Sequence, residues 1–162
     1  QLQIKTDKYE SKKEWSKLAN TFQHMQSLED LRLYFSENRK LSTELEYAKN
    51  LSLLTNLKRL SLDLQKQNQI ATQFIQEMGN QLSQLYNLEL FLFSVNYLNG
   101  FEANDLLYII KCISILQKLK FVKIQRNFLP GKITKSTLLN QIARKNRRLV
   151  VFNVEFFFRK YL

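Results

Sequence analysis

Residues 88–98 read Leu-Glu-Leu-Phe-Leu-Phe-Ser-Val-Asn-Tyr-Leu, and their apolar side chains follow a fixed spacing. Leu88 is separated from Phe91 by two residues and Phe91 from Phe93 by one, which is typical of a short strand with one buried face. The same spacing recurs along the chain, in units whose first members lie 29, 31, 31 and 30 residues apart. The five units are Leu28-Leu31-Leu33, Leu57-Leu60-Leu62, Leu88-Phe91-Phe93, Leu119-Val122-Ile124 and Leu149-Phe152-Val154. A fixed period of this length predicts a solenoid of stacked repeats.

Two apolar residues at the start of the chain continue this period upstream. Leu2 and Ile4 are in register with Leu31 and Leu33, so we expect the chain to begin partway through a repeat. The chain closes with a run of aromatic residues, whereas terminal repeats normally carry a polar cap. We therefore expect residues 1–162 to be a single domain that is a segment of a longer chain, with more protein or a partner covering its ends.

Between the predicted strands, apolar residues recur at spacings of three and four, which places each set on one face of an amphipathic helix. From the N-terminus, the sets are Trp15, Leu18, Phe22 and Met25; Leu45, Ala48, Leu51 and Leu54; Phe74, Ile75, Met78, Leu82 and Leu85; Leu106, Leu107, Ile109, Ile110, Ile113 and Leu116; and Leu138, Leu139, Ile142 and Ala143. Asn99-Gly100 and Pro130-Gly131 are turn signals in consecutive units. Because strands joined by helices run parallel, the sequence predicts an α/β fold.

Two units carry an asparagine after the strand, Asn96 and Asn127, and complete the pattern apolar-x-x-apolar-x-apolar-x-x-Asn-x-Leu. This pattern resembles the leucine-rich repeat, and the long unit is similar to the ribonuclease-inhibitor-like branch and to repeats found in ciliates. The resemblance implies a leucine-rich-repeat solenoid, with a curved parallel sheet on the concave side and helices on the convex side. It implies about five repeats plus a partial N-terminal one, within a single leucine-rich-repeat domain. It also implies that both asparagines bond the backbone inside the coil, because an unsatisfied buried amide costs roughly 1–3 kcal/mol.

Successive side chains of a strand point to opposite faces, so the residues between the apolar positions are expected on the face away from the helices. They are Asp30, Arg32 and Tyr34; Arg59, Ser61 and Asp63; Leu90, Leu92 and Ser94; Phe121, Lys123 and Gln125; and Val151, Asn153 and Glu155. The last three units present a contiguous apolar stripe of Leu90, Leu92, Phe121 and Val151 beside Lys123. An exposed apolar patch rimmed by polar groups usually marks a protein interface. The competing interpretations are a register shifted by one residue, or another segment that covers the stripe.

Charge is distributed unevenly along the chain, whose formal net charge is +11. Residues 1–110 hold 12 basic and 13 acidic side chains, which sums to −1, whereas residues 111–162 hold 13 basic and one acidic, which sums to +12. Such asymmetry indicates contact with a polyanion or an acidic partner. The residues expected to bind a polyanion are Lys132, Lys135, Arg144, Lys145, Arg147 and Arg148. The alternative is a solvated helix surface that keeps the protein in solution.

The cysteine, histidine and glycine residues exclude several kinds of site. Cys112 is the only cysteine, which excludes an internal disulfide and favours an intracellular, reducing compartment in which this thiol packs as a small hydrophobe. His24 is the only histidine, which excludes a metal site built on imidazoles. Gly79, Gly100 and Gly131 are too far apart to form a phosphate-binding loop, and no activated nucleophile is visible. We therefore expect no catalytic residues, no metal and no cofactor.

These observations predict a non-catalytic protein–protein interaction or scaffold module, or a subunit of a larger assembly, that binds a protein partner on its concave face. The expected contact residues are Tyr34, Arg59, Leu90, Leu92, Phe121, Lys123 and Val151. The alternative functions are nucleic-acid or polyanion binding through the basic C-terminal third, or a spacer that stiffens a larger protein. We expect no small-molecule substrate. We also expect no membrane insertion, because the longest apolar stretch, residues 106–116, is short and is interrupted by Lys111.

Overall fold

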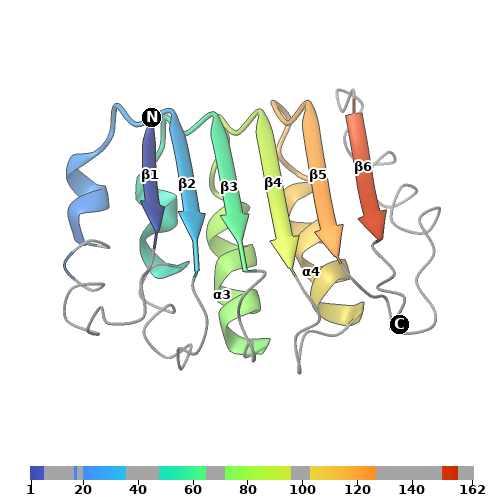
Figure 1. Ribbon diagram of the computed structural model, residues 1–162. Helices are drawn as coiled ribbons and strands as arrows, with labels where there is room; N and C mark the ends of the chain where they lie inside the picture. Colours follow the sequence, from blue (N-terminus) through green and yellow to red (C-terminus); the bar gives the residue numbers. More distant parts are fainter. Residues whose placement is uncertain are drawn as a thin grey trace.

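The chain folds into an α/β arrangement, shown by the computed structural model in Figure 1. The structure describes residues 1–5, 17, 20–35, 48–64, 72–95, 103–126 and 151–156. Within these residues, six strands form one sheet in the order in which they occur in the chain, and all neighbouring pairs are parallel. The strands are β1 (Leu2–Lys5), β2 (Asp30–Tyr34), β3 (Arg59–Asp63), β4 (Leu90–Val95), β5 (Phe121–Arg126) and β6 (Val151–Phe156).

The pairing register of the strands repeats the spacing found in the sequence. Equivalent positions of successive units are direct neighbours across the sheet, so the apolar residues form continuous rows. From β1 to β6, one such row consists of Leu2, Leu31, Leu60, Phe91, Val122 and Phe152. The predicted register of the units is therefore confirmed, including the upstream position of Leu2. A register shifted by one residue is excluded.

Alternation along each strand sends one set of side chains into the core. In β4, Phe91, Phe93 and Val95 are buried, whereas Leu90 and Leu92 are only partly buried. Phe91 and Phe93 share a face because side chains two residues apart point the same way. Their rings stack with centroids 6.0 Å apart and planes inclined by 12°.

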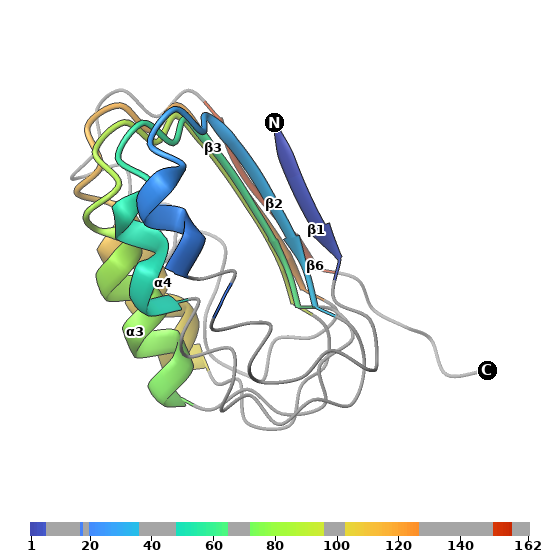
Figure 2. The same ribbon diagram turned by 90° about the vertical axis from the view of Figure 1, so that its left-hand side faces the viewer.

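The helical segments lie on one face of the sheet (Figure 2). Two short 3₁₀ helices, η1 (Phe22–His24) and η2 (Leu51–Leu53), precede β2 and β3. Two α-helices, α3 (Thr72–Leu82) and α4 (Ala103–Ile113), precede β4 and β5. No described element covers the opposite face of the sheet, which we call the open face.

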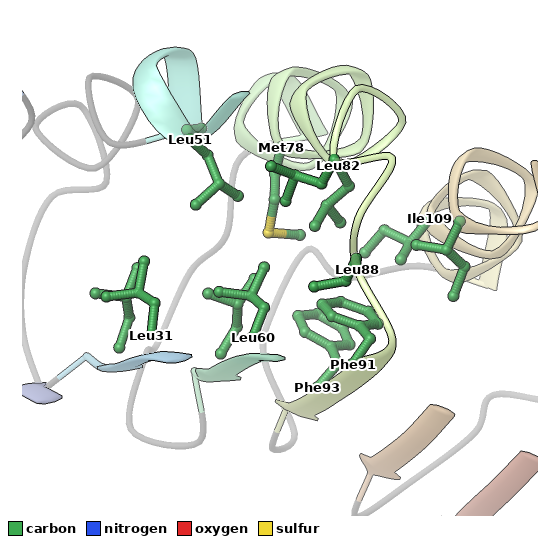
Figure 3. Close-up of a cluster of buried hydrophobic side chains, with 14 of the residues drawn as sticks. Leu31, Leu51, Leu60, Met78, Leu82, Leu88, Phe91, Phe93 and Ile109 are labelled. Atoms are coloured by element: carbon green, nitrogen blue, oxygen red, sulfur yellow. The ribbon is translucent and has the colours of Figure 1, made fainter. Parts of the chain in front are cut away.

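Apolar side chains from the two layers meet in one core (Figure 3). Leu31 and Leu60 rise from the sheet, and Leu51 and Met78 extend from the helical layer toward them. All four side chains are buried. Burying a leucine or methionine side chain contributes roughly 1.5–3 kcal/mol, so this shared core holds the layers together.

The helical segments end earlier than the apolar spacing predicts. Leu54, Leu85 and Leu116 are predicted as the last helical positions, but each lies in the turn before the next strand. Each is still fully buried in the core. Their carbonyls accept hydrogen bonds from the backbone N–H three residues later, at 3.0 Å from Leu57, 2.9 Å from Leu88 and 3.1 Å from Leu119. The predicted helix ends are wrong because a tight turn produces the same spacing of three as a helix.

Several predicted features lie outside the described residues, and their roles stay predictions. They are the asparagines Asn96 and Asn127, the turn pairs 99–100 and 130–131, the apolar residues Trp15, Leu18 and Leu45, and the last apolar set at 138–143.

Helices α3 and α4 approach each other closely at Gly79. An added Cβ at this glycine would lie 2.6 Å from Tyr108 Cε1 and 3.1 Å from Cys112 Sγ. The tyrosine ring is held in place because its hydroxyl donates a 2.6 Å hydrogen bond to Asn80 Oδ1. Cys112 is partly buried in this contact, and burial raises the pKa of its thiol. The thiol therefore takes part in packing between the helices.

We expect Gly79→Ala to lower the free energy of unfolding by about 1–3 kcal/mol, because the new methyl group overpacks the contact with Tyr108. Helix propensity alone would favour alanine by about 1 kcal/mol, so the sign of the change separates the two effects. Chemical denaturation followed by circular dichroism measures the change. Gln76→Ala, at an exposed position of the same helix, is the control and should alter stability little. A Gly79→Ala protein more stable than the parent would contradict the close contact.

Candidate interaction surface

The register of the strands arranges the side chains of the open face in rows that cross the sheet. The first row is Asp30, Arg59, Leu90, Phe121 and Val151; the second is Arg32, Ser61, Leu92, Lys123 and Asn153; the third is Tyr34, Asp63, Ser94, Gln125 and Glu155. Every residue predicted to contact a partner therefore occupies an open-face position. The structure brings them onto one surface, although they come from five strands spread along the sequence.

The apolar stripe consists of Leu90, Phe121 and Val151 in the first row and Leu92 beside them in the second. Leu90 pairs with Phe121, and Phe121 with Val151, so the three side chains lie on adjacent strands. Parallel strands lie about 4.8 Å apart, which leaves no room for a polar group between these neighbours. Val151 is 39% exposed, and the other three are partly exposed. The stripe is thus a continuous apolar strip open to solvent at the surface of the sheet.

A cluster of one carboxylate and two arginines occupies the other half of the open face. Arg59 Nε lies 3.2 Å from Asp30 Oδ2, and Arg32 Nε lies 3.5 Å from Asp30 Oδ1. The Asp30 side chain is only 8% exposed, whereas the side chains of Arg32 and Arg59 are 44% and 55% exposed. Alternation predicts Asp30 on the open face, but its carboxylate is buried there because it is paired with two long arginine side chains. We call these three residues the arginine cluster.

An open hollow of about 480 Å³ lies beside the arginine cluster, and Asp30 and Arg59 form part of its lining. Its lining also includes His24, Ser27 and Glu29 beside the apolar Met25 and Leu28, so polar groups predominate. Through this open hollow, solvent can reach the Arg59 side chain.

The third row of the open face is polar along its described length. Ser94 Oγ donates a 3.0 Å hydrogen bond to Gln125 Oε1, which links β4 to β5. Tyr34 and Asp63 are neighbours in this row and are partly buried. The apolar stripe therefore has a polar border on the side where the strands end.

At the opposite edge, asparagines in the turns before the strands connect consecutive units. Asn56 Nδ2 donates to the carbonyl of Gln26, and Asn87 Nδ2 donates to the carbonyl of Thr55, both at 2.8 Å. Lys118 Nζ continues the series by donating a 2.6 Å hydrogen bond to Asn87 Oδ1. Sequence reasoning missed this ladder. Its signal is the recurrence of asparagine 31 residues apart before Leu57 and Leu88.

Two exposed ion pairs reinforce the same edge. Lys58 Nζ lies 2.6 Å from Glu29 Oε1, and Lys120 Nζ lies 2.8 Å from Glu89 Oε2. In each pair the hydrogen bond from the lysine, and then its positive charge, lowers the pKa of the glutamate below its ordinary value. Lys58 and Lys120 are therefore already paired with glutamates of the preceding units.

The residues predicted to bind a polyanion all lie outside the described residues: Lys132, Lys135, Arg144, Lys145, Arg147 and Arg148. Of the basic residues that precede β5, Lys118 and Lys120 are engaged by Asn87 and Glu89. Lys123 lies in the second row, between Leu92 and Asn153.

Two features are absent from the described part of the chain. Among its residues, no group of three or more histidine, cysteine, aspartate or glutamate side chains could hold a metal ion. None of its helices is long and apolar enough to cross a membrane. No protein-family model and no curated protein sequence matches the chain. Any assignment of function therefore depends on the side chains of the open face.

We expect the pKa of Glu89 to lie below the ordinary glutamate value of 4.5 and to return toward it in Lys120→Gln. Because folding lowers this pKa, the pair stabilises the protein above about pH 4.5, and the effect is lost as the pH falls through the folded-state pKa. A carboxyl ¹³C NMR titration measures both values. Lys111→Gln, on the exposed surface of α4, is the matched control and should leave Glu89 unchanged. An unshifted Glu89 in the parent protein would show that the pair does not form in solution.

Proposed function

We propose that the chain is a leucine-rich-repeat solenoid of the ribonuclease-inhibitor-like kind, and that it is a non-catalytic protein–protein interaction or scaffold module. Support for the solenoid comes from the strand order, which follows the chain, and from the one-sided helical layer. Core positions 29 to 31 residues apart in the sequence are also direct neighbours in the sheet. Each unit then buries its apolar face against the next, as stacked repeats do.

The apolar stripe is the single observation that carries the proposed function. Leu90, Leu92, Phe121 and Val151 are large apolar side chains on a face that no described element covers. Fold stability does not require apolar residues at these positions, because the equivalent first-row positions of β2 and β3 are Asp30 and Arg59. A contiguous apolar patch bordered by polar rows is characteristic of a protein interface, with aromatic and arginine side chains as its strongest anchors. The partner would therefore bind across the open face.

We expect Leu92→Glu combined with Phe121→Glu to abolish partner capture while the circular dichroism spectrum stays that of the folded chain. The two carboxylates would require desolvation at the centre of the contact, which is costly without a partner charge. The measurement is a pull-down from extract of the cells that produce the protein, with and without nuclease, followed by mass spectrometry. Proteins that are captured by the parent chain after nuclease treatment, and are absent from the double variant, define the partner.

A matched control tests whether general stickiness explains the capture. Leu53 and Ile115 are exposed apolar residues outside the open face, 40% and 52% accessible. Leu53→Glu with Ile115→Glu adds the same charge and removes similar apolar area, and we expect it to leave capture unchanged. A folded Leu92→Glu, Phe121→Glu variant that still captures the same proteins would disprove the proposed interface.

The charge distribution favours one alternative function, nucleic-acid or polyanion binding through the basic C-terminal third. Residues 111–162 carry 13 basic side chains and one acidic, as counted from the sequence. Lysine and arginine that neutralise phosphates release counterions, so such binding weakens steeply as salt is added. The described residues supply a counterargument, because Lys118 and Lys120 are already engaged by Asn87 and Glu89.

The alternative predicts that affinity for a generic single-stranded RNA falls steeply with salt and is lost when Arg144, Arg147 and Arg148 are all changed to glutamate. Fluorescence anisotropy over a salt titration measures both effects. The Leu92→Glu, Phe121→Glu variant is the control and should keep its RNA affinity, since the stripe carries no phosphate-binding group. Affinity that survives both high salt and the charge reversal would exclude nucleic-acid binding through this region.

A further inference from the structure

The arginine cluster and the apolar stripe are parts of one row. From β2 to β6, the first row of the open face reads Asp30, Arg59, Leu90, Phe121 and Val151. Arg59 is thus the direct neighbour of Leu90, the first residue of the stripe. A ligand that covers the stripe and continues toward β2 meets a guanidinium as its next contact.

The geometry of the cluster leaves its arginines able to bind a further anion. Both ion pairs with Asp30 are made by Nε, and no further hydrogen bond or ion pair of the Arg32 or Arg59 side chain occurs within the described residues. Two guanidinium groups face the Asp30 carboxylate, and the nearby Glu29 is paired with Lys58. The three cations and two carboxylates of this group therefore sum to a charge of +1. Because the Asp30 side chain is 8% exposed, its carboxylate is a fixed anchor that restricts both arginines. Arginine binds carboxylates with its paired N–H groups, so the terminal amino groups are suited to a carboxylate from a partner.

The spacing of the row favours a helix as the ligand. Neighbouring strands lie about 4.8 Å apart, so Arg59 and Val151 are separated by roughly 14 Å. Residues on one face of an α-helix recur every three to four positions, about 5–6 Å apart, which approximates one contact per strand. In an extended peptide, side chains on one face are about 6.8 Å apart and do not match consecutive strands.

We infer that the ligand of the open face is an amphipathic helical segment of a protein partner, with an acidic side chain at one end of its apolar face. This inference rests on the proposed interaction function and specifies its ligand. The acidic side chain binds Arg59 and Arg32, and the apolar side chains cover Leu90, Phe121 and Val151. Asp30 acts as a positioning residue that holds the two arginines at the end of the stripe.

Selection from a library of random peptides displayed on phage, each about 16 residues long, tests this ligand chemistry on the immobilised full chain. We expect the selected peptides to carry apolar residues three or four positions apart and an Asp or Glu one turn beyond them. The same selection on Arg59→Glu should replace the acid with Lys or Arg and keep the apolar pattern. Lys111→Glu on α4 makes the same charge change away from the open face, and peptides selected on it should match those of the parent chain.

A binding measurement with one selected peptide provides a test that avoids placing a second carboxylate beside Asp30. Arg59→Gln should weaken the acidic peptide about tenfold, as expected for loss of a charge-assisted hydrogen bond. The same substitution should leave affinity unchanged for a peptide whose acid is replaced by its amide. Circular dichroism of Arg59→Gln confirms that the fold is retained.

The outcomes separate this inference from the proposed function. Three results would overturn the inference of a helical acidic ligand. The peptides selected on the parent chain could lack an acidic residue or show apolar residues two positions apart, as in an extended strand. The peptides selected on Arg59→Glu could still carry the acidic residue. If those peptides still require Leu92 and Phe121, the interaction function stands while the inference fails. If no peptide depends on Leu92 or Phe121, both fail.

Discussion

Leu31, Leu60, Phe91 and Val122 lie side by side across four parallel strands, and none of them is accessible to solvent. A single strand followed by a helical segment could not bury such a residue on all sides. Each of these side chains is covered partly by its counterparts on the neighbouring strands and partly by the helical layer. The strands also depend on their neighbours for backbone hydrogen bonds, because a parallel strand makes none with itself. Burial and hydrogen bonding therefore both require that consecutive units stack in register.

This requirement acts on one face of the sheet and leaves the other free to vary. The first-row position that is Arg59 in β3 is Leu90 in β4 and Phe121 in β5, although the buried neighbours of all three remain apolar. The packing of the core does not distinguish among these three side chains. A change from charged to apolar along one row of the open face consequently needs an explanation other than stability, and binding supplies one.

The strands and their register could be predicted because alternation within a strand and a fixed period between strands are both visible in the sequence. The helix ends could not, since Leu85 has the same spacing from Leu82 whether a helix continues or a turn begins. The burial of Asp30 was also missed, because alternation assigns it to the surface, and only the folded arginine side chains cover it. The asparagine ladder is partly visible as a repeated residue, but the acceptors of Asn56 and Asn87 belong to other units and become known only from the structure.

The position of the arginine cluster also bears on how selectively the open face can bind. An arginine loses substantial rotamer freedom when it is ordered, and the anchor at Asp30 reduces that loss before any ligand arrives. A ligand that covered Leu90 and Phe121 but offered no acceptor to Arg59 would withdraw the guanidinium from water without replacing its hydrogen bonds. That penalty falls on ligands without an acceptor at this position and not on acidic ones. In the proposed interface, the apolar stripe would therefore supply affinity for many partners, while Asp30 and its two arginines would determine which of them can occupy the whole row.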